Sequence, residues 1–300
     1  MTDRLLRFDV SGSPVRGEWI ELDSAWREIV SRHAQESEAI AVLGELTAAS
    51  MLLSATLKHR GRLTAQITGD GPISLMVVDC HAGGTFRATL KRSAQAAAQA
   101  GGASDAIGLL NPNGGARFAI TIDPREDGTT AYQGIVPLEG TSIATMLEHY
   151  MDRSEQLPTR LWLAADEQRA VGLLLQKIPQ PAGSALPDVD AWGRLQKIAD
   201  TLSSAEMLGT DGDTLMHRLF WQERTAMTQT HTLSFACSCS RKRVADMLRM
   251  LGADDLRNLL AEQGLVSVNC DYCNTPYGFD AVDVQALFEA DALPPNPTRQ

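Results

Sequence analysis

The spacing of apolar residues predicts a mixed α and β fold for the first part of the chain. Residues 38–59 and 142–153 carry apolar side chains at helical spacing. Residues 62–68 alternate apolar and polar, a Gly-Asp-Gly-Pro turn follows at 69–72, and 73–79 is an apolar run, a sequence typical of a β-hairpin. Further strands are predicted at residues 86–90, 117–122, 132–136, 161–164 and 170–177.

The later part of the chain has a helical pattern and is set off by prolines 179, 181 and 187. Residues 188–208 and 213–221 predict amphipathic helices, which gain most of their stability by packing an apolar face on a support. Beyond them we expect helices at 241–251, 254–263 and 281–288, the last capped by Asp280, and a strand at 265–269. Residues 93–115, rich in Ala, Gln, Gly and Asn, are expected to form a long mobile loop.

These patterns together predict an α+β protein in three parts. We expect a mixed α/β N-terminal core domain at residues 1–178, a small helical middle region at 179–232 and a small α+β C-terminal domain at 233–293. The tail, 294–300, is expected to be disordered.

Composition narrows the class of protein. Hydrophobic residues make up 44% and charged residues 21%, which is ordinary for a soluble globular chain. The net charge of -10 argues against a nucleic-acid partner, because phosphate contacts supply most of that affinity. The longest apolar runs are too short for a membrane span, and residues 1–10 lack the apolar core of an export signal. We therefore expect a cytoplasmic protein, in which thiols are normally reduced.

The most specific chemistry lies in four of the five cysteines. Cys237 and Cys239 form a C-x-C motif, and Cys270 and Cys273 form a C-x-x-C motif. Four thiols in two close pairs can be brought together on one tetrahedral Zn²⁺ ion, with Zn–S distances near ~2.3 Å. The same thiols can also release the metal by forming two disulfides. The cluster is therefore predicted to be a zinc site that oxidation can switch.

Three other interpretations compete with a redox switch. The cysteines could form a purely structural zinc knuckle in a static adaptor protein, which is the commonest use of such pairs. They could form a zinc ribbon for nucleic acid, which the acidic charge disfavours. Cys270 and Cys273 could serve a thiol–disulfide oxidoreductase, but that chemistry favours a C-x-x-C at a helix N-terminus, and here the motif follows a predicted strand.

The C-x-C spacing favours the switch. In an extended segment residues i and i+2 face the same side about 6.6 Å apart, which suits two ligands of one metal. That separation lies at the wide end of the range for a disulfide, so a bond closed there should be strained and reducible. Residues 241–243, Arg-Lys-Arg, could offset the negative charge of a four-thiolate site or could simply be a solvated helix start.

The free energy that zinc contributes, compared with the stability of a domain, indicates what oxidation would do. Structural zinc contributes on the order of 10–16 kcal/mol to a small fold, whereas whole domains are stable by only about 5–15 kcal/mol. Loss of the metal should therefore unfold the C-terminal domain. If the middle helices depend on it, apolar side chains such as Trp192, Leu195, Leu219 and Phe220 would reach solvent. An exposed apolar surface on a soluble acidic protein suits the binding of unfolded client proteins.

The chain resembles the redox-regulated 33 kDa chaperonin family, also called heat-shock protein 33, over most of residues 4–290. The resemblance rests on the two cysteine motifs and on short segments in the family's order: 50–58 (SMLLSATLK), 61–72 (GRLT…GDGP), 120–123 (ITID), 132–136 (YQGIV) and 154–160 (SEQLPTR).

This resemblance implies a stress-activated holdase, not an enzyme. In the reduced state zinc would sit on Cys237, Cys239, Cys270 and Cys273, and the chaperone would be inactive. Under peroxide or hypochlorous stress with heat, disulfides Cys237–Cys239 and Cys270–Cys273 would form and zinc would leave. The protein would then act as a homodimer on unfolding clients without ATP, in keeping with the absence of a phosphate-binding loop motif from the sequence. Cys80, at the end of an apolar strand, is expected to be a buried structural residue.

Overall fold

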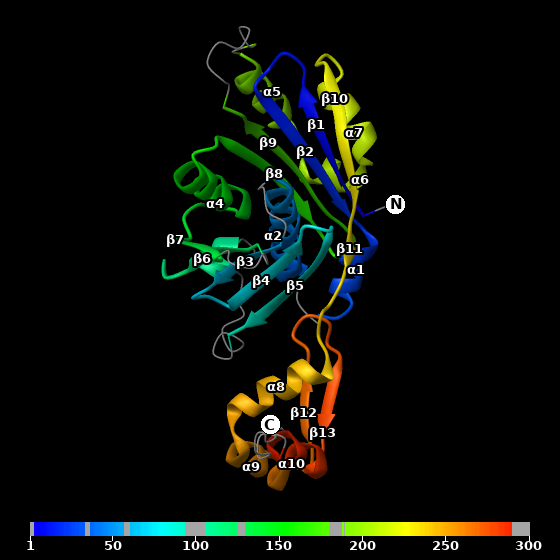
Figure 1. The fold of residues 1–300 in the computed structure, drawn as a ribbon. Helices are drawn as coiled ribbons and strands as arrows, with labels where there is room; N and C mark the ends of the chain where they lie inside the picture. The colour runs from blue at the N-terminus through cyan, green and yellow to red at the C-terminus, as the bar shows by residue number, and fades with distance from the viewer. Residues whose placement is uncertain are drawn as a thin grey trace, which may run out of the picture. The chain divides into compact units, whose positions relative to one another are not determined.

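The computed structural model describes residues 3–33, 37–56, 61–93, 106–124, 130–179, 188 and 190–289. Contacts divide the chain into two compact units, Met1–Ala236 and Cys237–Gln300 (Figure 1). Helices and strands are mixed in both units, so the predicted α+β class is confirmed. The three-part division of the chain stays a prediction.

The first unit contains a five-stranded antiparallel sheet with the order β10-β1-β2-β9-β8 (Figure 1). Its central strands are buried on both faces, because Leu5 and Ile20 belong to one apolar cluster while their neighbours Leu6 and Trp19 belong to another. Apolar layers therefore cover both sides of this sheet. The strands are β1 (Arg4–Val10), β2 (Val15–Leu22), β8 (Thr159–Ala165), β9 (Ala170–Lys177) and β10 (Thr225–Thr232).

A second sheet of the same unit has the order β11-β5-β4-β3-β6-β7. Its neighbours pair antiparallel except β11, which pairs parallel with β5. The predicted hairpin is β3 and β4, and all seven residues of β3 pair with both neighbours. The strands are β3 (Arg62–Thr68), β4 (Ile73–His81), β5 (Thr85–Arg92), β6 (Arg117–Asp123), β7 (Tyr132–Pro137) and β11 (Ser234–Phe235).

Helix α2 (Ser37–Thr56) packs against strands of both sheets and forms the centre of the larger apolar core. Among the described residues it is the one helix long and apolar enough to suit a membrane span, but 83% of that window is buried inside the protein. Its composition is thus explained by its place in the core. The shorter helical elements around it are α1 (Ser24–Val30), α3 (Ala106–Leu110), α4 (Ile143–Tyr150) and the π-helix η2 (Met151–Glu155).

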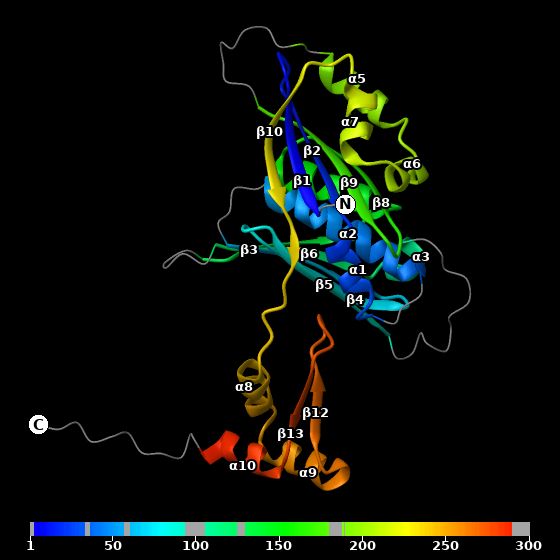
Figure 2. The ribbon, with the colours of Figure 1, turned by 90° about the vertical axis from the view of Figure 1, so that its right-hand side faces the viewer.

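Three helices of the middle region lie on the other face of the first sheet (Figure 2). They are α5 (Ala191–Ala199), α6 (Ser204–Gly209) and α7 (Gly212–Phe220). Their apolar faces complete a second core, in which the rings of Phe8 and Phe220 lie 5.6 Å apart. Polar contacts add to this packing: Arg169 donates to the Leu208 carbonyl at 2.6 Å, and the Gly212 N–H donates to Glu21 at 3.1 Å.

The second unit is small. It contains α8 (Arg241–Leu251), α9 (Ala253–Gln263), α10 (Ala281–Glu289) and the antiparallel pair β12 (Val266–Asn269) and β13 (Pro276–Phe279). Asp280 accepts a hydrogen bond from the Asp283 N–H at 2.8 Å, so it caps α10 as the sequence predicts. The buried core of the second unit consists of Ala245, Leu248, Leu256, Val266, Phe279, Val284 and Leu287.

Two sequence predictions of elements are wrong in detail. The single helix predicted over 188–208 is broken after Ala199, and Ser203 begins α6 by accepting a hydrogen bond from the Glu206 N–H at 3.2 Å. The loop predicted over 93–115 contains helix α3, and residues 94–105 of it lie outside the described residues. Strands β1, β2, β10 and β13 were not predicted.

Glu45, on α2, generates a prediction about stability. Burial raises the pKa of its carboxyl from 4.5 to about 7. Glu45 ionises at a lower pH in the unfolded chain than in the folded protein, so the free energy of unfolding should fall as the pH rises from 4.5 towards 7. Above that range the full cost of burying the charged carboxylate should apply. We expect Glu45→Gln to raise the free energy of unfolding at pH 8 by about 1–3 kcal/mol, measured by urea denaturation.

The matched control is Glu38→Gln, which removes an exposed carboxylate from the first turn of the same helix. This control should change stability by less than about 0.5 kcal/mol. A Glu45→Gln protein no more stable than the wild type at pH 8 would show that the carboxylate carries no ionisation penalty.

Candidate metal centre

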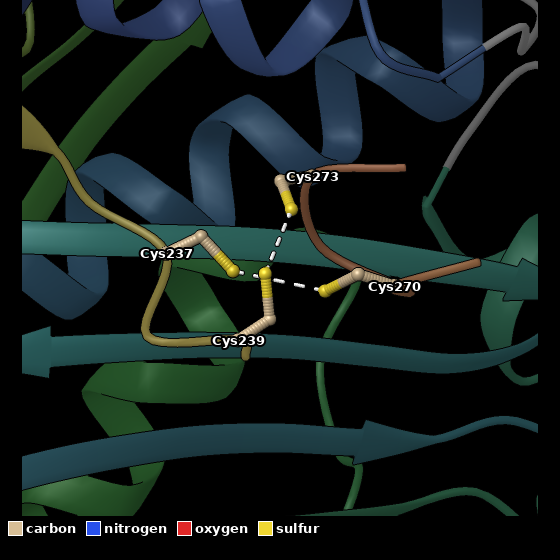
Figure 3. A group of neighbouring side chains, drawn as sticks. All are labelled: Cys237, Cys239, Cys270 and Cys273. Carbon is tan, nitrogen blue, oxygen red and sulfur yellow. Dashed lines mark hydrogen bonds between the residues drawn. The ribbon is translucent and has the colours of Figure 1, made fainter. Parts of the chain in front are cut away.

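The structure brings the four predicted cysteines into one cluster (Figure 3). Their sulfur atoms all lie within 4.8 Å of one another. The closest pairs join the two motifs: Cys237 Sγ lies 3.7 Å from Cys270 Sγ, and Cys239 Sγ lies 3.3 Å from Cys273 Sγ. None of the four cysteines is in a disulfide, so all four sulfurs are available as ligands.

A β-hairpin turn positions Cys270 and Cys273. Strands β12 and β13 pair from Val266–Phe279 to Asn269–Pro276, and the C-x-x-C motif lies in the connection between them. The Cys270 N–H donates to the Thr275 carbonyl at 3.0 Å, and the Asn274 N–H donates to the Cys270 carbonyl at 2.8 Å. Asn274 has a φ of 54°, a left-handed conformation that asparagine tolerates well.

The C-x-C motif lies in the segment that leads into α8. Ser240 caps this helix by accepting a hydrogen bond from the Arg243 N–H at 3.3 Å. The Arg243 guanidinium donates to both the carbonyl and the hydroxyl of Ser238, each at 2.7 Å. The residue between the two cysteines is thereby tied to the first turn of the helix.

Arg241 connects the C-x-C side of the site to the hairpin side. Its guanidinium donates to the Gly278 carbonyl at 2.7 Å and to Asp283 at 2.7 Å, and it lies 4.3 Å from the centre of the Phe279 ring. The basic run after Cys239 therefore contributes structural contacts. Oxygen acceptors engage both Arg241 and Arg243, so neither side chain is simply solvated.

Hydrogen bonds around the sulfurs favour thiolate at one position. Burial opposes ionisation of Cys273, but hydrogen bonds from Thr275, whose hydroxyl lies 3.1 Å from the sulfur, lower the pKa of Cys273 to about 6. The Tyr277 hydroxyl donates to Cys239 Sγ at 3.1 Å, which raises the pKa of Tyr277 to about 12. Burial raises the pKa of Cys237 and Cys270.

The arrangement fits a tetrahedral thiophilic metal ion. Four sulfurs at ~2.3 Å from one ion would lie about 3.8 Å from each other, close to the cross-motif distances in the cluster. Hydroxyl donors at Cys239 and Cys273 are the kind of outer contacts that hold metal-bound thiolates. Among the described residues, no histidine or carboxylate joins the four sulfurs. That the cysteines ligate a metal stays a prediction.

Sequence reasoning missed the residues that support the sulfurs. Thr275 and Tyr277 follow the C-x-x-C motif, but their spacing gives no sign that they point at sulfur. Cys80 behaves as predicted: it is 0% exposed, and burial raises the pKa of its thiol well above the usual value. A buried neutral thiol of this kind is unsuited to nucleophilic chemistry.

Comparisons with known proteins cover nearly the whole chain. The sequence model of the Hsp33 protein family matches residues 3–280. A 33 kDa chaperonin of Chromobacterium violaceum is 43% identical over 292 residues, covering 97% of this chain and 95% of that protein. A 33 kDa chaperonin of Methylobacillus flagellatus is 42% identical over 296 residues, covering 98% and 97%.

The fold is also found in a solved structure. The crystal structure of a 33 kDa chaperonin, a heat shock protein 33 homologue from Thermotoga maritima, matches with a TM-score of 0.79 over 97% of this chain and 99% of that chain. Its sequence is 20% identical, so this likeness concerns the fold alone. The family match and the close relatives confirm the resemblance found in the sequence: the chain belongs to the Hsp33 family.

Proposed function

We propose that this protein is a redox-regulated, ATP-independent chaperone that holds unfolding proteins and prevents their aggregation. The relatives named 33 kDa chaperonin support a chaperone. The observation that carries the redox regulation is the cluster of four cysteine thiols outside any disulfide, which fits one Zn²⁺ ion. In this proposal the reduced, zinc-bound protein is inactive, and oxidation activates it. The ion supplies cohesion to the second unit; it takes no part in a reaction.

The small size of the second unit makes the metal decisive. Among its described residues the core is one cluster of seven buried apolar side chains, and so small a core gives little stability by itself. Structural zinc contributes on the order of 10–16 kcal/mol, as much as the whole stability of an ordinary domain. Loss of the ion should therefore unfold the second unit while the larger core of the first unit survives.

Oxidation would separate the two halves of the site. In each motif two thiolates would give two electrons to the oxidant and form a disulfide, Cys237–Cys239 or Cys270–Cys273. Hydrogen peroxide would take up two protons and leave as two waters, and hypochlorous acid would take up one proton and leave as chloride and water. The short sulfur contacts in the reduced cluster run between the motifs, 237 to 270 and 239 to 273. Disulfides within each motif would remove the ligands and also end these cross-motif contacts. The C-x-C segment and the hairpin would then have no sulfur link.

The chain between the middle region and Cys237 offers a route by which unfolding of the second unit can reach the middle helices. Cys237 comes two residues after β11, a strand of two residues held to the second sheet by the Ser234 and Ala236 N–H groups at 3.1 and 3.0 Å. Strand β10 and helices α7, α6 and α5 precede it. Once the second unit unfolds, this thin attachment should fray, and the middle helices should detach and expose their apolar faces to clients.

The remaining features of the proposal follow from this mechanism. We infer that the partners are unfolded client proteins and, in the active state, a second copy of the chain. The protein acts in the cytoplasm, where its thiols stay reduced until stress. It has no catalytic turnover, and neither nucleic acid nor membrane is a partner.

One observation favours a second candidate, a thiol–disulfide oxidoreductase. Cys273 has a pKa of about 6, a value typical of reactive thiols. However, the motif lies in a hairpin turn and not at a helix N-terminus. An insulin-reduction assay separates the two, since an oxidoreductase works in catalytic amounts and a holdase only near stoichiometry.

The proposed function predicts a coupled response to oxidation. Peroxide at raised temperature should release about one zinc per chain and, over the same time course, switch on suppression of aggregation of a denatured reporter protein. Zinc release is followed with a chromophoric chelator and aggregation by light scattering. Zinc release without any suppression of aggregation would contradict the chaperone function.

The outer contacts of the site predict a second result. Tyr277→Phe removes the hydroxyl that donates to Cys239, and loss of such a contact typically weakens metal binding ~10–100-fold. Competition with a zinc chelator should therefore show weaker binding, and less oxidant should be needed for activation. Tyr132→Phe, an exposed tyrosine of the first unit, is the matched control and should bind zinc normally. Equal zinc affinity in both variants would show that the Tyr277 contact does not support the site.

A further inference from the structure

Strand β10 covers the edge of β1 but is a poor partner for it. The two strands pair antiparallel from Arg4–Thr232 to Val10–Thr225, side by side in both views (Figures 1 and 2). All eight residues of β10, Thr-Ala-Met-Thr-Gln-Thr-His-Thr, are exposed. A strand that buries none of its side chains gains little from its place at the sheet edge beyond its backbone hydrogen bonds.

The mismatch is sharpest on the face that the middle helices cover. On this face β1 presents Leu6, Phe8 and Val10, each at most 4% exposed. The β10 residues opposite them are Thr230, Met227 and Thr225, all exposed, and Met227 keeps 53% of its surface in solvent. An apolar row therefore lies beside a largely polar one, although paired apolar side chains would stabilise the sheet better.

The pairing of β1 with β10 and the packing around this pair are also irregular. The register shifts between Arg7 and Phe8, so that Thr228 is an extra residue in β10, as in a β-bulge. A surface pocket of about 300 Å³ lies among β1, β10 and α7, lined in part by Phe8, Phe220 and Trp221. Trp221 itself is 67% exposed. The contact between β1 and β10 thus lacks the close packing that holds most strands in place.

The opposite edge of the same sheet is blocked. The Leu161 N–H of β8 donates to the Glu148 carboxylate of α4 at 2.7 Å, and α4 packs along this strand. A new strand could not pair there without displacing that contact. Within the described part of this sheet, β1 is the edge that release of the middle region would open.

We propose that the edge of β1 is a client-binding site, at which an extended segment of an unfolded protein replaces β10. The proposal rests on the proposed function, because release of the middle region must remove β10 and uncover Leu6, Phe8 and Val10. Addition of a strand to an open sheet edge is a general mode of peptide recognition, in which backbone hydrogen bonds give affinity and alternate side chains give selectivity.

The geometry defines the class of segment that fits. It is an extended stretch that pairs antiparallel with β1 and places apolar side chains at alternate positions, opposite Leu6, Phe8 and Val10. Such segments form buried strands in folded proteins and are exposed when those proteins unfold. Once the middle helices are released, such segments can cover the apolar side chains of β1, which the threonines of β10 could not cover as well, so they compete well for the edge.

Hydrogen exchange of the full-length protein tests the site directly. The β1 amides that donate to β10 should exchange slowly in the reduced protein and rapidly after oxidation. They should exchange slowly again when a guanidinium-denatured reporter protein without cysteines is added. Rapid exchange of these amides within the client complex would overturn the proposal.

A disulfide between the strands provides the matched functional test. Asp9 and Ala226 are opposite each other and exposed, so Asp9→Cys with Ala226→Cys can hold β10 on β1. With the bond verified by mass spectrometry, the oxidised protein should release zinc as the wild type does but lose suppression of client aggregation. The control, Asp9→Ser with Ala226→Ser, should still suppress client aggregation.

The outcomes separate this site from the function on which it rests. Full suppression by the bonded protein would overturn the β1 site and leave the chaperone function standing. A serine control that releases zinc but does not suppress aggregation would overturn the proposed function, and the β1 site with it.

Discussion

Four sulfur atoms hold together two segments that the chain brings from far apart. The contacts from Cys237 to Cys270 and from Cys239 to Cys273 cross between the motifs, so the cluster closes the loop that contains α8, α9 and β12. The apolar core of this unit is small, and its other connections, such as those of Arg241, are largely exposed. Exposed ion pairs contribute little, so a metal ion would have to supply most of the cohesion of the unit.

The first unit is built differently. Helix α2 lies between two sheets, and apolar clusters cover both faces of β1, β2 and β9. A core of this extent survives the loss of a peripheral element. The middle helices and β10 are attached to it through one face and one edge, and they lead directly to Cys237. In the proposed function, oxidation at the sulfurs would thus loosen the covering of a stable sheet without unfolding the sheet itself.

Much of the fold could be predicted from the sequence, and the exceptions have physical reasons. Strands β3 and β9 have the predicted bounds, because apolar patterns and turn residues define them. Strand β2 was missed because burial on both faces removes the alternation that marks a strand, whereas β1 does alternate from Leu6 to Val10 and was overlooked. Strand β10 has no apolar pattern at all, since it is held by backbone pairing with β1.

In the candidate site, too, some features could be predicted from the sequence and others could not. The spacing of Cys237, Cys239, Cys270 and Cys273 was enough to predict that they meet, because two close pairs are the usual signature of a tetrahedral site. The contacts of Thr275 and Tyr277 with sulfur depend on the hairpin geometry, which local sequence does not encode. The edge position of β10 depends on strand order, a property of the whole first unit.

Removal of zinc with the cysteines kept reduced shows whether the metal alone holds the second unit folded, because it separates loss of the metal from disulfide formation. Hydrogen exchange of the full-length protein would be followed before and after chelation in the presence of a thiol-free reductant. We expect the amides of the second unit, including those of α8 and β12, to lose their protection while those of α2 keep it. Full protection of the second unit in the metal-free, reduced protein would show that its fold does not depend on the metal.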